Sequence, residues 1–329
     1  MMSQSQSVMQ QSAVAAPAVA APASTTTTRL PRKRGLNALA RREAIDGFLF
    51  ISPWLIGFVL FTAGPMLASF GLVFMDWDLL SDPKWGGLTN IQRLTTDRLV
   101  GLSLYNTAYY TLFSVPIRLG LALAIAMLLN AQVKGLAFWR TAFYLPAVVP
   151  AVANVILWMW MFNPTMGLFN MILTTFGLPR SNWVWDPSLS KPSLILMSTW
   201  TLGNVVVIFL AGLQSVPRSL YEAAQIDGGG GWAQFRHVTL PLISPVVLFN
   251  LVMGIIFSFQ VFTSAFLITQ GGPANTTLFT VLYLYQVAFE QFKVGYASAI
   301  AWVLFLVILV FTLIQWLLAN RWVYYEGKR

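Results

Sequence analysis

Side chains that could do chemistry are scarce in this chain of 329 residues. The single histidine, His237, has Arg236 and Val238 as neighbours, which offer no metal-ligand spacing. A solvent-facing histidine is the simpler interpretation. The glycine run Gly228 to Gly231 lacks a following Lys-Ser/Thr pair and a preceding strand, so it is not a phosphate-binding loop. We therefore predict no catalytic residue, no metal site and no cofactor in this chain.

The carboxylates also lie where they argue against proton-driven chemistry. None of the 11 lies well inside an apolar stretch, whereas proton-coupled carriers usually need an acid or histidine within the membrane. A secondary carrier or channel for a small polar solute is thereby weakened, yet it stays as the alternative. An enzyme embedded in the membrane is the least favoured class. The carboxylates are Glu43, Asp46, Asp76, Asp78, Asp82, Asp97, Asp186, Glu222, Asp227, Glu290 and Glu326.

The composition places most of the chain in a lipid bilayer. Hydrophobic residues make up 57% and charged residues only 9%, which a water-soluble globule of this length could not bury in one core. We predict an all-α integral membrane protein, because six apolar stretches are long enough to cross about 30 Å of hydrocarbon as helices. They cover residues 48–74, 104–129, 138–162, 193–214, 245–268 and 298–319.

The basic residues predict the orientation of these spans. With the N-terminus inside, thirteen of the 20 basic residues are cytoplasmic and six lie outside, as the positive-inside rule requires. The cytoplasmic set is Arg29, Arg32, Lys33, Arg34, Arg41, Arg42, Lys134, Arg140, Arg218, Arg236, Arg321, Lys328 and Arg329. The outer set is Lys84, Arg93, Arg98, Arg180, Lys191 and Lys293. Both termini are then cytoplasmic, and anionic membrane lipid, with no nucleic acid, accounts for the net charge of +9.

Three regions follow from these patterns. Residues 1–46 are rich in Gln, Ser, Ala, Pro and Thr and then in basic residues, so we predict a disordered, basic cytoplasmic tail. Residues 47–325 form the six-span domain, and 326–329 form the cytoplasmic C-terminal end. Between the fourth and fifth spans, residues 215–244 make a cytoplasmic loop.

This loop has the pattern of two short helices. Pro217 suits a first helical turn, and apolar residues then fall at helical spacing. Four glycines cannot sustain a helix, so the chain should turn there. A three-residue period resumes at Trp232 and should stop at Pro241. An amphipathic helix pair between two spans has little to bury against lipid, so we expect it to dock in a groove of a soluble partner.

The same loop carries a family resemblance. Glu222-Ala223-Ala224, Gly228 and Val238-Thr239-Leu240-Pro241 resemble the EAA loop, E-A-A-x3-G-x9-I-x-L-P, of the permeases of binding-protein-dependent ABC importers. The only changed anchor is Val for Ile. The resemblance implies a type I ABC importer fold in which the loop seats in a cleft of the ATPase. Glu222, Ala223, Ala224, Gly228, Leu240 and Pro241 then couple to that subunit, with Glu222 as a polar contact and Gly228 as the turn.

The loop departs from the family where three more glycines follow Gly228. Each extra glycine destabilises a helix by about 1 kcal/mol, so we expect the second short helix to start later or to be softer.

Further positions between residues 48 and 325 resemble the MalF-type sugar permeases. They are Asn106-Thr107, Arg140, Pro146, Phe162-Asn163-Pro164, Gly167, Asn170, Thr269-Gln270-Gly271-Gly272-Pro273, Thr276, Tyr285, Phe289 and Gly295-Tyr296-Ala297-Ser298-Ala299.

The resemblance implies a set of partners and a place in the cell. The partners are a second, MalG-like permease, two ATP-binding subunits that hold ATP and Mg, and an extracytoplasmic solute-binding protein. The location is a bacterial or archaeal plasma (inner) membrane. A sugar is implied as solute, although glycerol phosphates, polyols and oligosaccharides stay open.

Candidate solute contacts lie on three spans. Trp200, Thr201 and Asn204 share one helical face, and Asn250, Phe257, Val261 and Ser264 share another. Aromatic and amide groups suit a sugar, but polar residues in membrane helices also hold helices together. Arg118 lies within the second span, where an unpaired arginine costs at least about 2.5 kcal/mol. We expect it to line the path toward an anionic or hydroxyl-rich solute, with structural pairing as the alternative.

Overall fold

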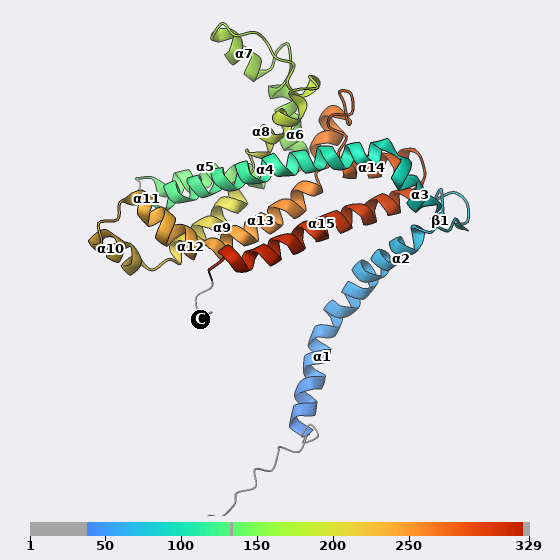
Figure 1. The fold of residues 1–329 in the computed structure, drawn as a ribbon, viewed down its shortest axis with the longest axis horizontal. Helices are drawn as coiled ribbons and strands as arrows, with labels where there is room; N and C mark the ends of the chain where they lie inside the picture. Colours follow the sequence, from blue (N-terminus) through green and yellow to red (C-terminus); the bar gives the residue numbers. More distant parts are fainter. Residues whose placement is uncertain (1–37, 132–133, 325–329) are drawn as a thin grey trace, which may run out of the picture. The chain divides into compact units, whose positions relative to one another are not determined.

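The computed structural model describes residues 38–131 and 134–324, which are mostly helical (Figure 1). The chain divides into two units, Met1–Phe61 and Thr62–Arg329. In the first unit, helix α1 (Ala38–Phe58) leads into a π-helical turn, η1 (Val59–Ala63). Residues 38–46 were predicted as disordered tail and are helical, because Ala, Leu, Arg and Glu extend a helix that the following apolar stretch already requires. The rest of the predicted tail and the C-terminal end 326–329 lie outside the described residues.

Three helical stretches are long and apolar enough to cross a membrane. They are Ala40–Leu72, which ends with α2 (Gly64–Leu72), then α4 (Arg98–Asn130) and α15 (Val294–Trp322). Each contains a predicted span or nearly all of it. Each also extends beyond that span at one or both ends, since a helix does not have to stop where its apolar segment stops.

Two of the other three predicted spans are bent pairs of helices, and the third contains α13 (Ser244–Phe259), which meets the helical run before it at a bend. α5 (Leu136–Val148) and α6 (Ala151–Met161) meet at 98°, and α8 (Ser190–Ser198) and α9 (Gly203–Gln214) at 50°. The helical run 231–242 meets α13 at 67°. The count reaches six if each bent pair crosses as one span. The continuous helices predicted over 138–162 and 193–214 were therefore wrong.

Local chemistry explains two of these breaks. Pro150 forces Val149 into an extended conformation, with ψ of 130°, so the helix ends there even though prolines elsewhere in the spans are accommodated. Between α8 and α9, the hydroxyls of Ser198 and Thr199 donate to the carbonyls of Ile195 and Leu196, each at 2.7 Å, and so compete for the acceptors of the helical ladder.

The predicted span 245–268 ends early for a similar local reason. α13 stops at Phe259, where the Gln260 N–H turns back to the Phe257 carbonyl at 3.2 Å. Helical structure resumes at residues 263–264, which lead into the π-helical turn η4 (Ala265–Thr269).

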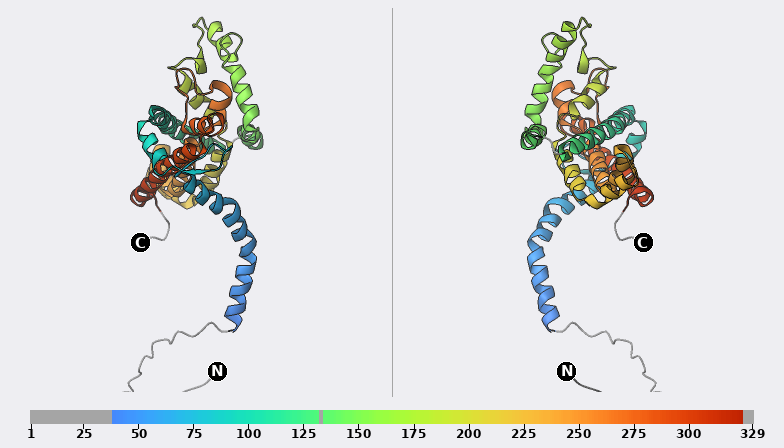
Figure 2. Two further views of the ribbon diagram at one scale, coloured as in Figure 1. Left: turned by 90° about the vertical axis from the view of Figure 1, so that its right-hand side faces the viewer. Right: turned by 90° about the vertical axis from the view of Figure 1, so that its left-hand side faces the viewer.

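Helices α4, α9, α13 and α15 run alongside one another as the bundle of the second unit (Figure 1). One apolar cluster surrounds the first half of α4 and includes Tyr110, Phe279 and Tyr296. A second surrounds its other half and includes Ala122 and Phe209. Figure 2 shows that the green segment with α6 and α7 (Leu168–Thr175) extends beyond this bundle.

Motif residues fasten the loops at one end of the bundle. The side-chain amide of Asn106 donates to the carbonyls of Asn275 at 2.8 Å and Leu278 at 3.2 Å, just before α14 (Thr280–Tyr285). The Thr107 hydroxyl accepts from the Thr280 N–H at 2.9 Å. The π-helical turn η5 (Gln286–Glu290) then leads to α15. Asn106 and Thr107 thus position the loop between η4 and α15.

Close backbone contacts explain Gly295. A hairpin with strands of two residues each, β1 (Met75–Asp76) and β2 (Lys84–Trp85), precedes α3 (Thr89–Thr96). The Asn90 amide donates to the Met75 carbonyl at 2.9 Å, and a Cβ on Gly295 would lie 1.9 Å from that same oxygen. Only glycine fits at the start of α15 there.

Candidate functional site: the coupling helices and a membrane cavity

The predicted helix pair between the fourth and fifth spans is present. α10 (Arg218–Ile226) begins after Pro217 and ends in a Schellman cap. The Gly228 N–H donates to the Gln225 carbonyl at 3.0 Å, and the Gly229 N–H donates to the Ala224 carbonyl at 2.7 Å. Gly228 has φ of +79°, where glycine is favoured. The turn that the sequence assigned to Gly228 is thereby located.

The second helix of the pair runs from Gly231 to Leu242 with one wide turn. It comprises α11 (Gly231–Gln234), the π-helical η3 (Phe235–Thr239) and α12 (Leu240–Leu242). The second helix starts at Gly231, the last of the four glycines, so these glycines do not delay its start beyond Trp232. The prediction that Pro241 stops it was wrong by one residue. Pro241 lies in the first turn of α12, where a missing N–H is tolerated.

Two hydrogen bonds that sequence analysis did not single out hold the pair together. The hydroxyls of Tyr221 and Thr239 lie 3.0 Å apart, and the Gln234 side chain donates to the Gly229 carbonyl at 3.0 Å. Tyr221 and Thr239 are 18 positions apart, and this spacing leaves no signal in the sequence. They fix the angle at which α10 and α11 present their outer faces.

The predicted coupling residues lie on this outer face to different degrees. Glu222, Ala223, Gly228 and Leu240 are exposed, and Ala224 and Pro241 are half-buried. Ile226 and Trp232 beside them are 87% and 72% exposed. The pair therefore offers a carboxylate flanked by large apolar side chains, which is the chemistry of a protein-docking surface.

A cavity of about 280 Å³ opens between α4, α9 and α13. Five of the eight predicted solute-path residues line it, namely Arg118, Thr201, Asn204, Asn250 and Phe257. The remaining lining is apolar and consists of Val115, Leu119, Val205, Ile208, Phe249, Met253 and Gly254. Tertiary packing thus brings together polar residues as far apart in the chain as Arg118 and Asn250, which are 132 positions apart.

The polar groups of the cavity differ in how they are bonded. The buried Asn250 donates to the Val246 carbonyl at 3.0 Å, while Asn204 is exposed. Within the described residues, the Nε atom of Arg118 is buried and has no hydrogen-bond partner. No carboxylate lines the cavity. The site therefore has an uncompensated positive charge beside two amides and the aromatic ring of Phe257.

Trp200, Val261 and Ser264 do not line this cavity. Trp200 lies in the bend between α8 and α9 and contacts Trp158, with 6.3 Å between ring centroids. Val261 packs against the apolar cluster around the first half of α4. The face that was predicted for Asn250, Phe257, Val261 and Ser264 assumed one straight helix, and α13 ends at Phe259.

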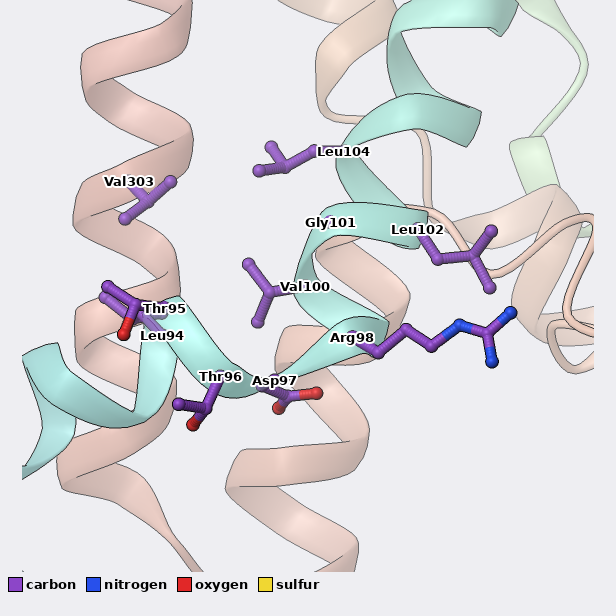
Figure 3. A pocket seen from close by; sticks show the side chains of 10 residues that line it. All are labelled: Leu94, Thr95, Thr96, Asp97, Arg98, Val100, Gly101, Leu102, Leu104 and Val303. Carbon is purple, nitrogen blue, oxygen red and sulfur yellow. The ribbon is translucent and has the colours of Figure 1, made fainter.

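A second, larger groove of about 660 Å³ lies between the start of α4 and α15 (Figure 3). Most of its lining is apolar, including Leu94, Val100, Leu104 and Val303. Its charged residue Asp97 caps α4 by accepting from the Leu99 N–H at 2.9 Å. Arg98 also lines the groove (Figure 3). Such a surface can pack against apolar groups, but its polar groups do not converge on one point.

The carboxylate of Asp97 is already engaged by two tyrosines. It accepts from the hydroxyls of Tyr283 at 2.5 Å and Tyr296 at 2.7 Å, and Arg93 lies 4.3 Å from the Tyr296 ring centroid. Burial by itself would raise the pKa of Asp97, but the hydrogen bonds and Arg93 outweigh it and lower the pKa. Sequence analysis did not predict this cluster, which joins α3, α4, α14 and α15.

Comparison with known proteins places these features in a family. Residues 117–324 match the family described as binding-protein-dependent transport system inner membrane component. The chain belongs to this family. The predicted family and the all-α type I ABC importer permease fold are confirmed, and the chain is a multi-pass membrane permease component of an ABC importer.

Similar proteins cover most of the chain. A probable ABC transporter permease, YesP of Bacillus subtilis, is 43% identical over 293 residues, covering 88% of this chain and 94% of YesP. The trehalose/maltose permease MalF of Thermococcus litoralis is 32% identical over 281 residues, covering 84% and 94%. The lactose permease LacF of Rhizobium radiobacter is 33% identical over 293 residues, covering 87% and 97%.

The fold also matches a solved structure. A chain in a bacterial alginate ABC transporter crystallised with its alginate-bound periplasmic protein has a TM-score of 0.71 and 24% identity. The match covers 87% of this chain and 98% of that one.

Proposed function

We propose that this permease forms, with a second MalG-like permease, the membrane path for a sugar or sugar-like solute. An extracytoplasmic binding protein delivers the solute, and two separate ATP-binding subunits hold ATP and Mg and drive its import. Support for a saccharide comes from similar proteins named for trehalose/maltose, lactose and arabinooligosaccharides. The proposal places both termini and α10 to α12 on the cytoplasmic side of a bacterial or archaeal plasma membrane.

The observation that carries the proposal is the connection between the coupling helices and the cavity. α10 follows α9 after the short segment 215–217, and α12 is joined to α13 through Ile243 alone. α9 and α13 provide two of the three walls of the cavity. A displacement of the coupling pair is therefore transmitted directly to the helices around Asn204 and Asn250.

This geometry suits alternating access. Closure of the ATP-binding subunits would move the coupling pairs of both permeases and rock the spans between inward-open and outward-open states. The bend between α8 and α9 divides that span into two segments, and the bend before α13 separates the coupling pair from the fifth span. Coupling must be reciprocal, so docking of the binding protein should promote closure of the ATP-binding subunits as strongly as closure alters docking.

Glu222→Ala tests the coupling assignment in the complete transporter. We expect loss of ATP-dependent uptake and of co-purifying ATP-binding subunits, with normal membrane insertion, because the exposed carboxylate supplies a polar contact to the partner. Asp227→Asn is the matched control, since Asp227 is an exposed carboxylate at the end of the same helix. Full uptake and stimulated ATPase activity in Glu222→Ala would contradict the assignment.

A further inference from the structure

We propose that the solute carries a carboxylate, as in a uronic-acid saccharide, and that Arg118 binds this group in the cavity between α4, α9 and α13. This inference rests on the proposed function as a saccharide importer. It narrows the solute from sugars in general to acidic ones.

Arg118 is a charged residue in apolar surroundings. Its guanidinium carries a positive charge and five N–H donors. It lies in α4, which is long and apolar enough to cross the membrane. Its Nε atom is buried and lacks a hydrogen-bond partner within the described part of the chain. A charge in such surroundings is costly unless an anion or water reaches it.

The positive charge of Arg118 has no counterion among the residues that line the cavity. Among the described residues, eleven side chains and one glycine line the cavity, and none of them is Asp or Glu. Neither Asn204 nor Asn250 can act as a counterion, and Asn250 already donates to the Val246 carbonyl. An intramolecular ion pair is the usual reason for an arginine within a span, and the cavity provides none. An anion that occupies the cavity would supply the counterion that its lining lacks.

Other groups that line the cavity suit a sugar. Thr201 and Asn204 supply a hydroxyl and an amide, which can donate to and accept from sugar hydroxyls. Phe257 is 61% exposed and offers a flat apolar face for a sugar ring. Together with Arg118, these groups match a ring that carries both hydroxyls and a carboxylate.

The charge also favours a carboxylate over a phosphate. A phosphate monoester carries about −1.5 to −2 charges at neutral pH, and Arg118 is the only basic residue that lines the cavity. A single carboxylate balances a single guanidinium, and the planar fork of arginine pairs with it bidentately.

The test uses the complete transporter with its own binding protein in cells that lack other saccharide uptake. The cells receive a mixture of oligouronates from pectin and alginate, their methyl esters, and neutral oligosaccharides from starch and galactan. Mass spectrometry identifies what accumulates. Accumulation of free oligouronates in preference to their methyl esters supports the proposal. Accumulation of neutral saccharides alone overturns it while leaving the importer function intact. If no saccharide of any kind accumulates, the proposed function itself fails.

Substitutions then assign the preference to Arg118. Arg118→Gln should lower oligouronate uptake by about ten- to a hundredfold, the range of a charged hydrogen bond, with solute affinity of the binding protein unchanged. Arg98→Gln is the matched control, because Arg98 lies on the same helix, is exposed and is outside the cavity. Equal oligouronate uptake by Arg118→Gln and the unsubstituted transporter overturns the proposal.

Arg118→Lys provides a second decision if the glutamine variant does not assemble. It preserves the positive charge but not the bidentate fork, so it should retain the preference for free acids over methyl esters at reduced uptake. An assembled Arg118→Lys transporter that takes up both forms equally would overturn the role of the charge.

Discussion

Replacing Asn170 by alanine should loosen the segment 163–183, which follows α6 and contains α7. This side chain is 1% exposed and makes four hydrogen bonds. Its amide donates to the carbonyls of Pro164 at 2.9 Å and Ser181 at 2.8 Å. Its oxygen accepts from the Ser181 N–H at 3.0 Å and the Trp183 indole N–H at 3.1 Å. One buried residue thus closes the ends of the segment on each other.

The expected magnitude follows from these bonds. Each contributes about 0.5–1.5 kcal/mol, so their loss should reduce the free energy of local opening by about 2–6 kcal/mol. Even the lower bound raises the population of the opened segment by more than about tenfold. The half-buried Asn163, whose hydrogen bonds are exposed to solvent, is the matched control. Its oxygen accepts from the N–H groups of Thr165 and Met166 and from the Thr165 hydroxyl, but water can replace it there.

Limited trypsin digestion of the reconstituted transporter measures this opening. Arg180 is exposed and precedes Ser181. Cleavage after Arg180 therefore reports release of the segment around Ser181 that Asn170 holds by hydrogen bonds. At low protease, the rate of cleavage follows the population of the opened form. We expect Asn170→Ala to accelerate cleavage at this bond by at least about tenfold and Asn163→Ala to accelerate it much less. Equal rates in the two variants would refute the assignment of Asn170 as the residue that closes this segment.

Two more substitutions test the Asp97 cluster and the coupling turn. The folded-state pKa of Asp97 is lowered, so its contribution to stability is present above its ordinary value of 3.8 and is lost as the pH falls through the folded pKa. Asp97→Asn should therefore lower the unfolding temperature at neutral pH, and the difference should shrink in acid; a constant difference would contradict this account. Gly228→Ala should weaken the cap of α10 by about 1–2 kcal/mol and reduce uptake, because a side chain with a Cβ atom clashes with the backbone at φ of +79°. Gly228→Asn should retain more uptake in the same assay, and equal loss would mean that the left-handed conformation is not what matters.

Local patterns were enough to predict several features of the protein. Apolar length located the three long helical stretches, and helical spacing with glycines located α10, the turn at Gly228 and the second helix. The EAA spacing indicated the family that residues 117–324 match. These features depend on neighbours within one or two helical turns, so they are encoded over short distances along the chain.

Bends within the apolar stretches were not predicted. Hydropathy measures whether a segment prefers lipid, and it is the same for a straight helix and a broken one. The break at Val149 had a local signal in Pro150 that was outweighed by the general tolerance of membrane helices for proline. The bend before Gly203 depends also on packing, since a Cβ at that position would lie 2.9 Å from the Tyr144 Cα.

The sequence by itself determined that this is a membrane protein with a pair of short helices between two spans, because composition and helical period reflect the free energy of each segment alone. Only the tertiary structure decided which polar residues share a cavity. Arg118, Asn204 and Asn250 meet because α4, α9 and α13 pack side by side, whereas Val261 and Ser264 are excluded because α13 ends at Phe259. Such proximity depends on the angles between helices, which arise from side-chain packing between segments far apart in the chain.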